Sequence, residues 1–227
     1  MPEIKPAVLE SLVGLVVHDL RNPAATLGAN IGFVHEVLDD PDVDRDELRD
    51  ALSDAQQALY ELQKGLDQLS WIGRWANEKN PVPSKVELLS ECIARLCPRV
   101  KYGAFEVEYP IPAVRVQGGE ALERMLELLV TNGHQHAPHK VVLLRALSEG
   151  DRVVIEVEDQ GKAIAPDLAQ IAFSLEGQTA VKGRSEGRYG RVAALFAAKV
   201  LAEALRAELS SIERAQHNVF RVVLAAL

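Results

Sequence analysis

The sequence predicts an α+β fold in two parts, a helical hairpin over residues 1–79 and a domain of mixed strands and helices over residues 86–227. Two long runs near the start carry an apolar residue at every third or fourth position, which is the period of an amphipathic helix. Residues 80–85, NPVPSK, contain two prolines and form a linker. After the linker, short β-rich runs and helical runs follow one another, which is typical of an α+β layer domain.

The first helical run extends over residues 9–38, where the apolar side chains form one seam. The acidic residues 39–47 interrupt this period and supply aspartates that can cap a new helix. The second run, residues 48–72, alternates steps of four and three, which is the spacing of a coiled coil. Because one hairpin cannot bury both seams completely, we expect a homodimer in which two hairpins form a four-helix bundle.

The excess negative charge is confined to the predicted hairpin. Residues 1–79 carry 7 Lys and Arg against 15 Asp and Glu, whereas residues 80–227 carry 18 of each, so the net charge of the chain is -8. This balance predicts no nucleic-acid partner. The apolar runs are too short to span a bilayer, the first residues lack the features of a secretory signal, and Cys92 and Cys97 lack the spacing of metal-binding pairs. We therefore expect a cytoplasmic protein with reduced thiols and no membrane span.

The pattern after the linker predicts six strands and two helices. The strands are expected at residues 105–109, 113–116, 140–147, 152–158, 207–212 and 219–224, and the helices at residues 120–135 and 192–205. Residues 148–151 are a turn that joins two of these strands as a hairpin.

His18 lies on the first predicted helix, at the start of the string HDLRNP. At about 100° per residue it is about 160° from the apolar seam, on a face of small or polar residues. A neutral imidazole can attack a phosphoryl group, Asp19 can accept a proton and fix the tautomer, and Asn22 can orient a water or a phosphoryl oxygen. The spacing fits a surface histidine before a proline kink as well, so by itself it leaves both interpretations open.

HDLRNP resembles the H-box of the sensor histidine kinases of two-component systems, in which an exposed histidine lies on the first helix of a dimerising hairpin. Residues 86–227 are similar to the Bergerat-fold ATP-binding domain of that family. The resemblance covers nearly the whole chain. It implies an α/β sandwich after the hairpin, with His18, Asp19 and Asn22 as the catalytic residues of the phosphoacceptor helix.

The string LLVTNGHQHAP, residues 128–138, resembles the N-box of these kinases. In this register Asn132 falls on the asparagine that implies Mg²⁺ coordination, Leu128 takes the place of the first asparagine, and His136 is expected to pack near the nucleotide. A side-chain carbonyl is a suitable ligand for Mg²⁺. Without the resemblance, Asn132 followed by Gly133 also fits a helix C-cap.

The string DQGKAI, residues 159–164, follows a predicted strand and resembles the first glycine box. The resemblance implies that Asp159 accepts a hydrogen bond from the adenine amino group and that Gly161 lets the backbone approach the base. Ala163 replaces the second glycine of the box, and we expect its methyl group to constrain the loop if the position needs a positive φ. The alternative is a plain turn after the strand.

The string GRSEGRYGRVAAL, residues 183–195, stands where the family has its last glycine box. Gly187 and Gly190 are three residues apart rather than two. Arg184 and Arg188 supply positive charge that can bind phosphate together with backbone N–H groups. The same string also fits a solvated basic loop. Phe173 is expected to correspond to the phenylalanine box of the family.

The resemblance implies an ATP-dependent protein-histidine kinase that autophosphorylates His18 and passes the phosphoryl group to an aspartate on a response-regulator receiver domain. ATP and Mg²⁺ are the expected nucleotide and cofactor, and Asn22 is expected to matter chiefly for a phosphatase reaction. Because His18 is close to the first residue, we expect input from a separate sensor protein. The altered boxes leave one alternative, a histidine phosphotransfer protein whose kinase-like domain no longer binds ATP.

Overall fold

The computed structural model describes residues 6–40, 43–75, 85–96, 105–108, 110–137, 140–165, 169, 171–174 and 193–227. The chain divides into two compact units, one over Pro2–Trp71 and one over Ile72–Leu227. No helix of the described residues is long and apolar enough to cross a membrane.

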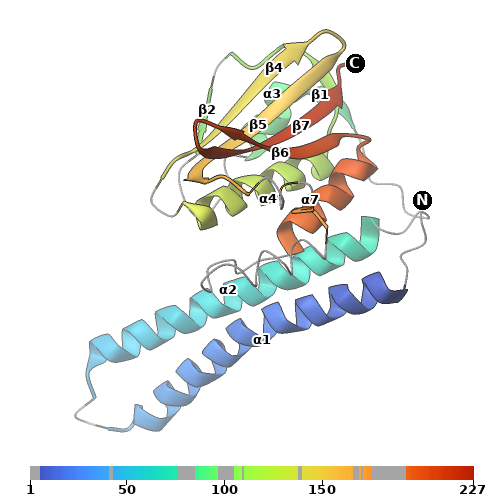
Figure 1. The fold of residues 1–227 in the computed structure, drawn as a ribbon. Coiled ribbons are helices and arrows are strands. Elements are labelled where there is room, and N and C mark those ends of the chain that lie inside the picture. The colour runs from blue at the N-terminus through green and yellow to red at the C-terminus, as the bar shows by residue number, and fades with distance from the viewer. Residues whose placement is uncertain are drawn as a thin grey trace. The chain divides into compact units, whose positions relative to one another are not determined.

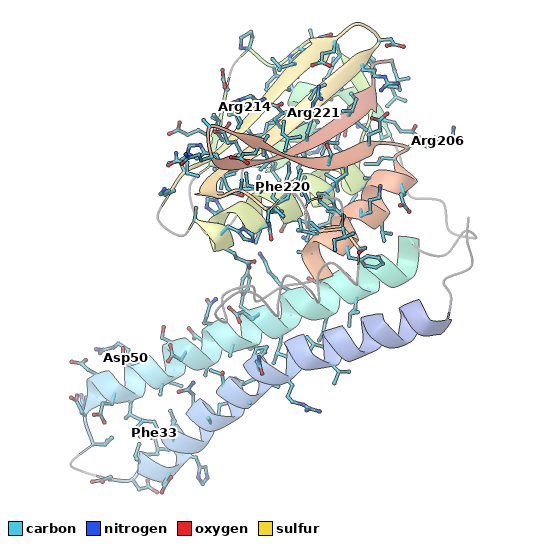
Figure 2. The ribbon with its side chains drawn as sticks, in the orientation of Figure 1. Phe33, Asp50, Arg206, Arg214, Phe220 and Arg221 are labelled. Carbon is cyan, nitrogen blue, oxygen red and sulfur yellow. The ribbon has the colours of Figure 1, made fainter. Side chains whose placement is uncertain are left out.

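The first unit is a helical hairpin. Helices α1 (Pro6–Val37) and α2 (Arg45–Trp75) lie side by side and run in opposite directions (Figure 1). Phe33 and Asp50, labelled in Figure 2, lie toward the turn that joins them. The N–H of Asp46 donates a hydrogen bond to Asp44 Oδ1 at 2.9 Å. Asp44 therefore caps α2, as the acidic segment predicted.

The apolar residues of α2 lie on two faces rather than on one seam. The buried face is made of three alanines, Ala51, Ala55 and Ala58. The exposed face is made of three leucines at heptad spacing, Leu52, Leu59 and Leu66, which are 50%, 45% and 55% exposed. Small residues also let α1 approach, because a Cβ atom on Gly65 would lie 2.6 Å from Leu20 Cδ2. One hairpin therefore buries its small residues and leaves a leucine stripe uncovered.

The second unit contains a five-stranded sheet in the order β2-β4-β5-β7-β6 (Figure 1). Its strands are β2 (Phe105–Val107), β4 (Val142–Glu149), β5 (Arg152–Lys162), β6 (Glu208–Arg214) and β7 (His217–Ala225). β2 pairs in parallel with β4, and the other neighbours are antiparallel. The β4–β5 hairpin turns at Gly150, whose φ of 66° favours glycine.

Helices α4 (Glu120–His136) and α7 (Ala193–Ala204) pack on one face of this sheet (Figure 1). Side chains from both layers are fully buried, including Met125, Leu129, Ile155, Leu201 and Phe220. Phe220 is labelled in Figure 2. Helix α3 (Leu89–Leu96) packs on α4 and on β1 (Val86–Leu88), which forms a two-stranded sheet with β3 (Arg115–Gln117). This is the α/β sandwich that the sequence predicted.

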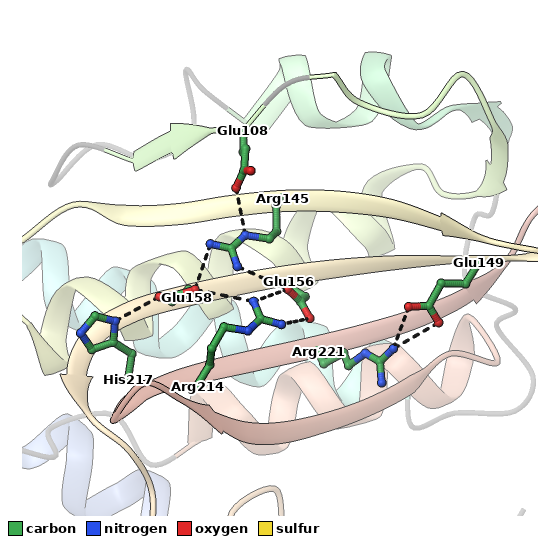
Figure 3. Close-up of polar contacts among 8 residues, drawn as sticks. All are labelled: Glu108, Arg145, Glu149, Glu156, Glu158, Arg214, His217 and Arg221. Atoms are coloured by element: carbon green, nitrogen blue, oxygen red, sulfur yellow. Dashed lines mark hydrogen bonds and ion pairs between the residues drawn. The ribbon is translucent and has the colours of Figure 1, made fainter.

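The opposite face of the sheet carries a network of ion pairs (Figure 3). Arg214 donates two hydrogen bonds to Glu156, at 2.7 and 2.8 Å, and Arg145 and His217 each lie 3.0 Å from Glu158. The hydrogen bonds from Arg214 lower the pKa of Glu156 below its ordinary value although burial acts to raise it. Acidic side chains on β5 are therefore matched by basic ones on its neighbours β4 and β7 and on β6, the next strand beyond β7.

A second ion-pair cluster joins β1, α3 and α4. Arg95 donates to Glu87 Oε1 at 2.7 Å and to Glu123 Oε1 at 2.5 Å, and these two glutamates are only 2% and 4% exposed. The backbone N–H of Gly119, just before α4, also donates to Glu87 Oε1 at 2.7 Å. Glu87, Cys92 and Glu123 are the one group of described residues whose ligand atoms are close enough to hold a metal ion. Arg95 already forms ion pairs with both carboxylates of this group.

Several boundaries differ from the sequence prediction. The prediction missed β1 and α3, because a three-residue strand and an eight-residue helix are too short to show a clear period. β2 ends at Val107 rather than at residue 109. The alternative in which Asn132 caps a helix end is wrong, since α4 continues to His136 and its C-cap is Ala137. The strand predicted over residues 152–158 continues to Lys162.

Candidate functional site

Asp159 lies in the last part of β5 and is completely buried. It stands opposite Asn218 of β7, and the strand pairing resumes only at Lys162 and His217, so Gln160 and Gly161 form a bulge. The bulge turns the N–H of Gly161 back toward Asp159 Oδ1, to which it donates a hydrogen bond at 2.8 Å. Asn218 Nδ2 donates to the other oxygen, Oδ2, at 3.0 Å. Both carboxylate oxygens are therefore held by donors.

Gly161 is packed too closely to carry a side chain. A Cβ atom there would lie 2.7 Å from Asp159 Oδ1 and 3.4 Å from both the Cβ and the carbonyl oxygen of His136. Ala163 is different, because its φ is not positive, and its N–H donates to the carbonyl of Gln216 at 3.3 Å. The methyl group of Ala163 was expected to constrain the loop only if this position needed a positive φ. The structure shows that it does not.

Helix α4 approaches the sheet closely at Gly133. A Cβ atom on this residue would lie 2.9 Å from Val142 Cγ2 and 3.1 Å from Asp159 Cβ. The absence of a side chain thus places the last two turns of α4 beside the end of β5. Asn132, the preceding residue, is 6% exposed, and its Nδ2 has no hydrogen-bond partner in the structure. Asn132 therefore has a buried side-chain amide that is not used up by helix capping.

Burial sets the protonation of the two ionisable groups at this site. It raises the pKa of Asp159, and hydrogen bonds from Asn218 and Gly161 together with the charges of His136 and His217 oppose this shift. Burial lowers the pKa of His136, and the charge of Asp159 opposes that shift. His136 is thus a neutral imidazole at neutral pH. A buried carboxylate with fixed donors on both oxygens is suited to accept a further hydrogen bond from an amino group.

The predicted site residues fall into three sets. The structure brings Asp159, Gly161 and His136 together, with Asn132 one turn earlier on α4 and Ala163 just after β5. On α1, Asn22 is exposed, whereas the side chains of His18 and Asp19 lie outside the described residues. The last glycine box also lies outside them, with Arg184, Gly187, Arg188 and Gly190.

The sequence analysis missed Asn218 because it began the last strand at residue 219. The alternation on β7 contains the signal, since the even-numbered residues 218, 220, 222 and 224 are all buried. A polar residue in that series needs a buried partner, which here is Asp159. Phe173 is 8% exposed and packs against Phe220 with ring centroids 6.1 Å apart, so it belongs to the core of this unit.

Residues 118–226 match the family described as histidine kinase-, DNA gyrase B-, and HSP90-like ATPases. Methanogenesis regulatory histidine kinase FilI of Methanothrix harundinacea is 28% identical over 179 residues, which cover 76% of this chain and 20% of FilI. Sensor histidine kinase MtrB of Mycolicibacterium paratuberculosis is 25% identical over 166 residues, covering 70% of this chain and 29% of MtrB. The chain thus spans less than a third of the length of either relative.

The fold is also that of solved histidine kinases. The structure of histidine kinase ThkA in complex with response regulator protein TrrA matches with a TM-score of 0.66 and 17% sequence identity. The match covers 97% of this chain and 63% of the ThkA chain. An ATPase-family domain implies that this unit binds ATP. Residues 118–226 therefore match the histidine kinase-, DNA gyrase B-, and HSP90-like ATPase family, and the chain as a whole is similar to sensor histidine kinases with a Bergerat ATP-binding domain.

Proposed function

We propose that this chain is an ATP-dependent protein-histidine kinase that phosphorylates its own His18 and then an aspartate of a response-regulator receiver domain. The observation that carries the proposal is the buried Asp159, whose two oxygens are fixed by Gly161 and Asn218 at the end of β5. This arrangement supports recognition of the exocyclic amino group of adenine. The helical hairpin supplies the phosphoacceptor helix, α1.

Every predicted site residue except Ala163 has a place in this proposal. Asp159 accepts a hydrogen bond from the adenine amino group, and Gly161 leaves room for the base beside His136. Arg184 and Arg188 neutralise phosphate charge, while the backbone at Gly187 and Gly190 donates N–H groups. Positioning and charge neutralisation supply most of the catalysis of phosphoryl transfer.

Asn132 is the residue that fits a magnesium ion. Its amide is buried, Nδ2 is unpartnered, and a half-turn of the amide exchanges its oxygen and nitrogen. An amide oxygen is a suitable hard ligand for Mg²⁺, which takes its other ligands from water and phosphate oxygens. Bound there, the ion would neutralise the negative charge that develops on the phosphates.

The transfer itself needs one nucleophile and one proton acceptor. A ring nitrogen of His18 bonds to the γ-phosphorus as the bond from that phosphorus to the β–γ bridging oxygen breaks, and ADP leaves. Asp19 accepts the proton of the imidazole. The phosphorus–nitrogen bond then breaks as a carboxylate oxygen of the regulator bonds to phosphorus. We assign Asn22, which is exposed on α1, to orienting the water of the reverse, phosphatase reaction.

The test is incubation with Mg²⁺ and ATP labelled at the γ-phosphate. We expect acid-labile, alkali-stable label on the wild-type chain and none on the variant His18→Ala. His35→Ala is the matched control, since His35 is exposed on the same helix, and it should be labelled like the wild type. Label that survives His18→Ala would disprove the assignment of His18.

Leu128 favours a second candidate function, a phosphotransfer protein that does not use ATP. It takes the place of an N-box asparagine and is 9% exposed, so it packs as a core residue and offers no ligand. This candidate predicts that the wild type stays unlabelled with ATP. It also predicts that a phosphorylated receiver domain transfers its phosphoryl group to the wild-type chain but not to the variant His18→Ala.

The leucine stripe of α2 supports a homodimer. Leu52, Leu59 and Leu66 repeat every seven residues and lie exposed on the single hairpin, so a second copy of the chain can bury them in a four-helix bundle. We expect Leu59→Glu to shift the chain from dimer to monomer in light scattering coupled to gel filtration. Gln57→Glu adds the same charge at an exposed polar position about 160° around the helix from Leu59 and should remain dimeric. A monomeric wild type would refute this proposal.

The partner in the second step follows from the same proposal. ThkA was solved in complex with the response regulator TrrA, which supports a receiver domain as the partner of this chain as well.

A further inference from the structure

A chain of hydrogen bonds runs across three strands behind Asp159. Ser211 Oγ of β6 donates to Asn218 Oδ1 of β7 at 2.7 Å, and Asn218 Nδ2 donates to Asp159 Oδ2 of β5 at 3.0 Å. Asp159 and Asn218 are both completely buried. Asn218 stands directly opposite Asp159, whereas Ser211 is its diagonal neighbour, because Ser211 pairs with Phe220. The three side chains therefore form one polar path through an otherwise apolar layer.

The carboxylate of Asp159 fixes which group donates at each hydrogen bond of this path. A carboxylate can only accept hydrogen bonds, so the amide of Asn218 must present its nitrogen to Asp159. Its oxygen then faces Ser211, and the hydroxyl group of Ser211 must donate. If the amide turned over, its oxygen would face the carboxylate, and two acceptors would be buried against each other at a cost of about 1–3 kcal/mol or more. The carboxylate of Asp159 thus selects the orientation of the amide, and the hydrogen bond from Ser211 helps to hold it.

We propose that Asn218, oriented by Ser211, is a positioning residue of the nucleotide site that holds the carboxylate of Asp159 in the orientation needed to accept a hydrogen bond from the amino group of adenine. The inference rests on the function proposed above and adds two residues to its site. Asn218 occupies one side of Oδ2, and Gly161 occupies one side of Oδ1. The carboxylate is therefore fixed from two sides before any base arrives.

The same bond helps to keep Asp159 ionised. Burial raises the pKa of Asp159, and the hydrogen bond from Asn218 is the strongest of the effects that oppose this. The other opposing groups are the N–H of Gly161, His136 on α4 and His217 on β7. An ionised Asp159 accepts from the adenine amino group, whereas a protonated one presents a donor to it. If the donor at residue 218 is removed, Asp159 should become protonated at a higher pH. Nucleotide binding should then be lost at a higher pH than in the wild type as the pH falls.

The test is ADP binding, measured by calorimetry between pH 5 and pH 9. We expect Asn218→Asp, which keeps the shape but replaces the donor by an acceptor, to move the midpoint of the pH profile upward by about one unit or more and to weaken binding about tenfold or more at pH 7. Ser211→Ala should move the midpoint in the same direction by less. Ser210→Ala is the matched control, because Ser210 is exposed on the same strand, and its profile should match that of the wild type.

A second readout needs no nucleotide. The carboxyl carbon of Asp159, followed by ¹³C NMR during a pH titration, should titrate at a higher pH in Ser211→Ala and in Asn218→Leu than in the wild type. These two milder variants keep the test available if Asn218→Asp does not fold. An unchanged titration in both would overturn the proposal even where affinity falls, because a merely structural role lowers affinity without moving the midpoint. If the wild type failed to bind ADP while the titrations moved, the proposed kinase function would be wrong and the positioning of Asp159 by Asn218 would stand without its adenine partner.

Discussion

Replacing Asp159 by Asn is expected to weaken ADP binding by about ten- to a hundredfold. A hydrogen bond to a charged group contributes about 1.5–3 kcal/mol, and each 1.4 kcal/mol is about a factor of ten in affinity. The substitution also disturbs the site from within. Asn218 Nδ2 and the N–H of Gly161 both donate to this side chain, so an amide nitrogen in place of either oxygen leaves two donors facing each other.

Asp151→Asn is the matched control for this prediction. Asp151 lies exposed in the turn between β4 and β5, at the opposite end of β5 from Asp159, so the same change of charge should leave ADP affinity unaltered. Calorimetry on both variants, with circular dichroism to verify the fold, checks the prediction. Wild-type affinity in a folded Asp159→Asn variant would show that this carboxylate does not recognise the base.

Replacing Arg95 by Leu is expected to cost about 3 kcal/mol of unfolding free energy, because it removes the cation that two buried carboxylates share and leaves Glu87 only the more distant Lys85, at 3.9 Å. Burial raises the pKa of Glu87, but hydrogen bonds from Arg95 and Gly119 outweigh it and hold that pKa below its ordinary value. The contribution of the ionised Glu87 is therefore complete above the ordinary carboxyl pKa and is lost as the pH falls through the lowered one.

Loss of Arg95 should reverse this dependence on pH. In the variant, burial dominates and raises the pKa of Glu87. Protonation of Glu87 as the pH falls therefore removes a buried charge and stabilises the folded variant. The difference in unfolding free energy between wild type and variant should shrink between pH 7 and pH 4 in urea titrations. Arg152→Leu is the control, since its pair with Glu208 is exposed at both ends and should contribute less than about 1 kcal/mol. An equal loss in both variants would contradict the role of Arg95.

The features that could be predicted from the sequence are those with a clear period or a local signal. The long helices of the hairpin, the β4–β5 hairpin and α4 all repeat over many residues. Asp159 was predicted just after the strand that contains it, because that strand continues to Lys162. The split of the α2 apolar residues into a buried alanine face and an exposed leucine face was not predicted. Both faces fit the same spacing, and only packing against α1 distinguishes them.

Contacts between residues distant in the sequence could not be predicted. The hydrogen bond of Asn218 to Asp159 joins residues 59 apart, and it depends on the register in which β7 pairs with β5. The role of Gly133 is of the same kind, because its need for a bare backbone comes from Val142 and Asp159 across the layer. At such positions, contacts with residues distant in the sequence determine which residue type is required.

The strand order has a consequence for how the domain is made during synthesis. β7 follows β6 in the chain, yet it lies between β5 and β6 and pairs with both. A nascent chain that has left the ribosome only as far as β6 therefore cannot join β6 to the rest of the sheet. Neither the amide of Asn218 nor its link to Ser211 exists at that stage. We expect the ability to bind ATP to appear abruptly and late, once residues 217–225 have emerged, and not to grow in step with chain length.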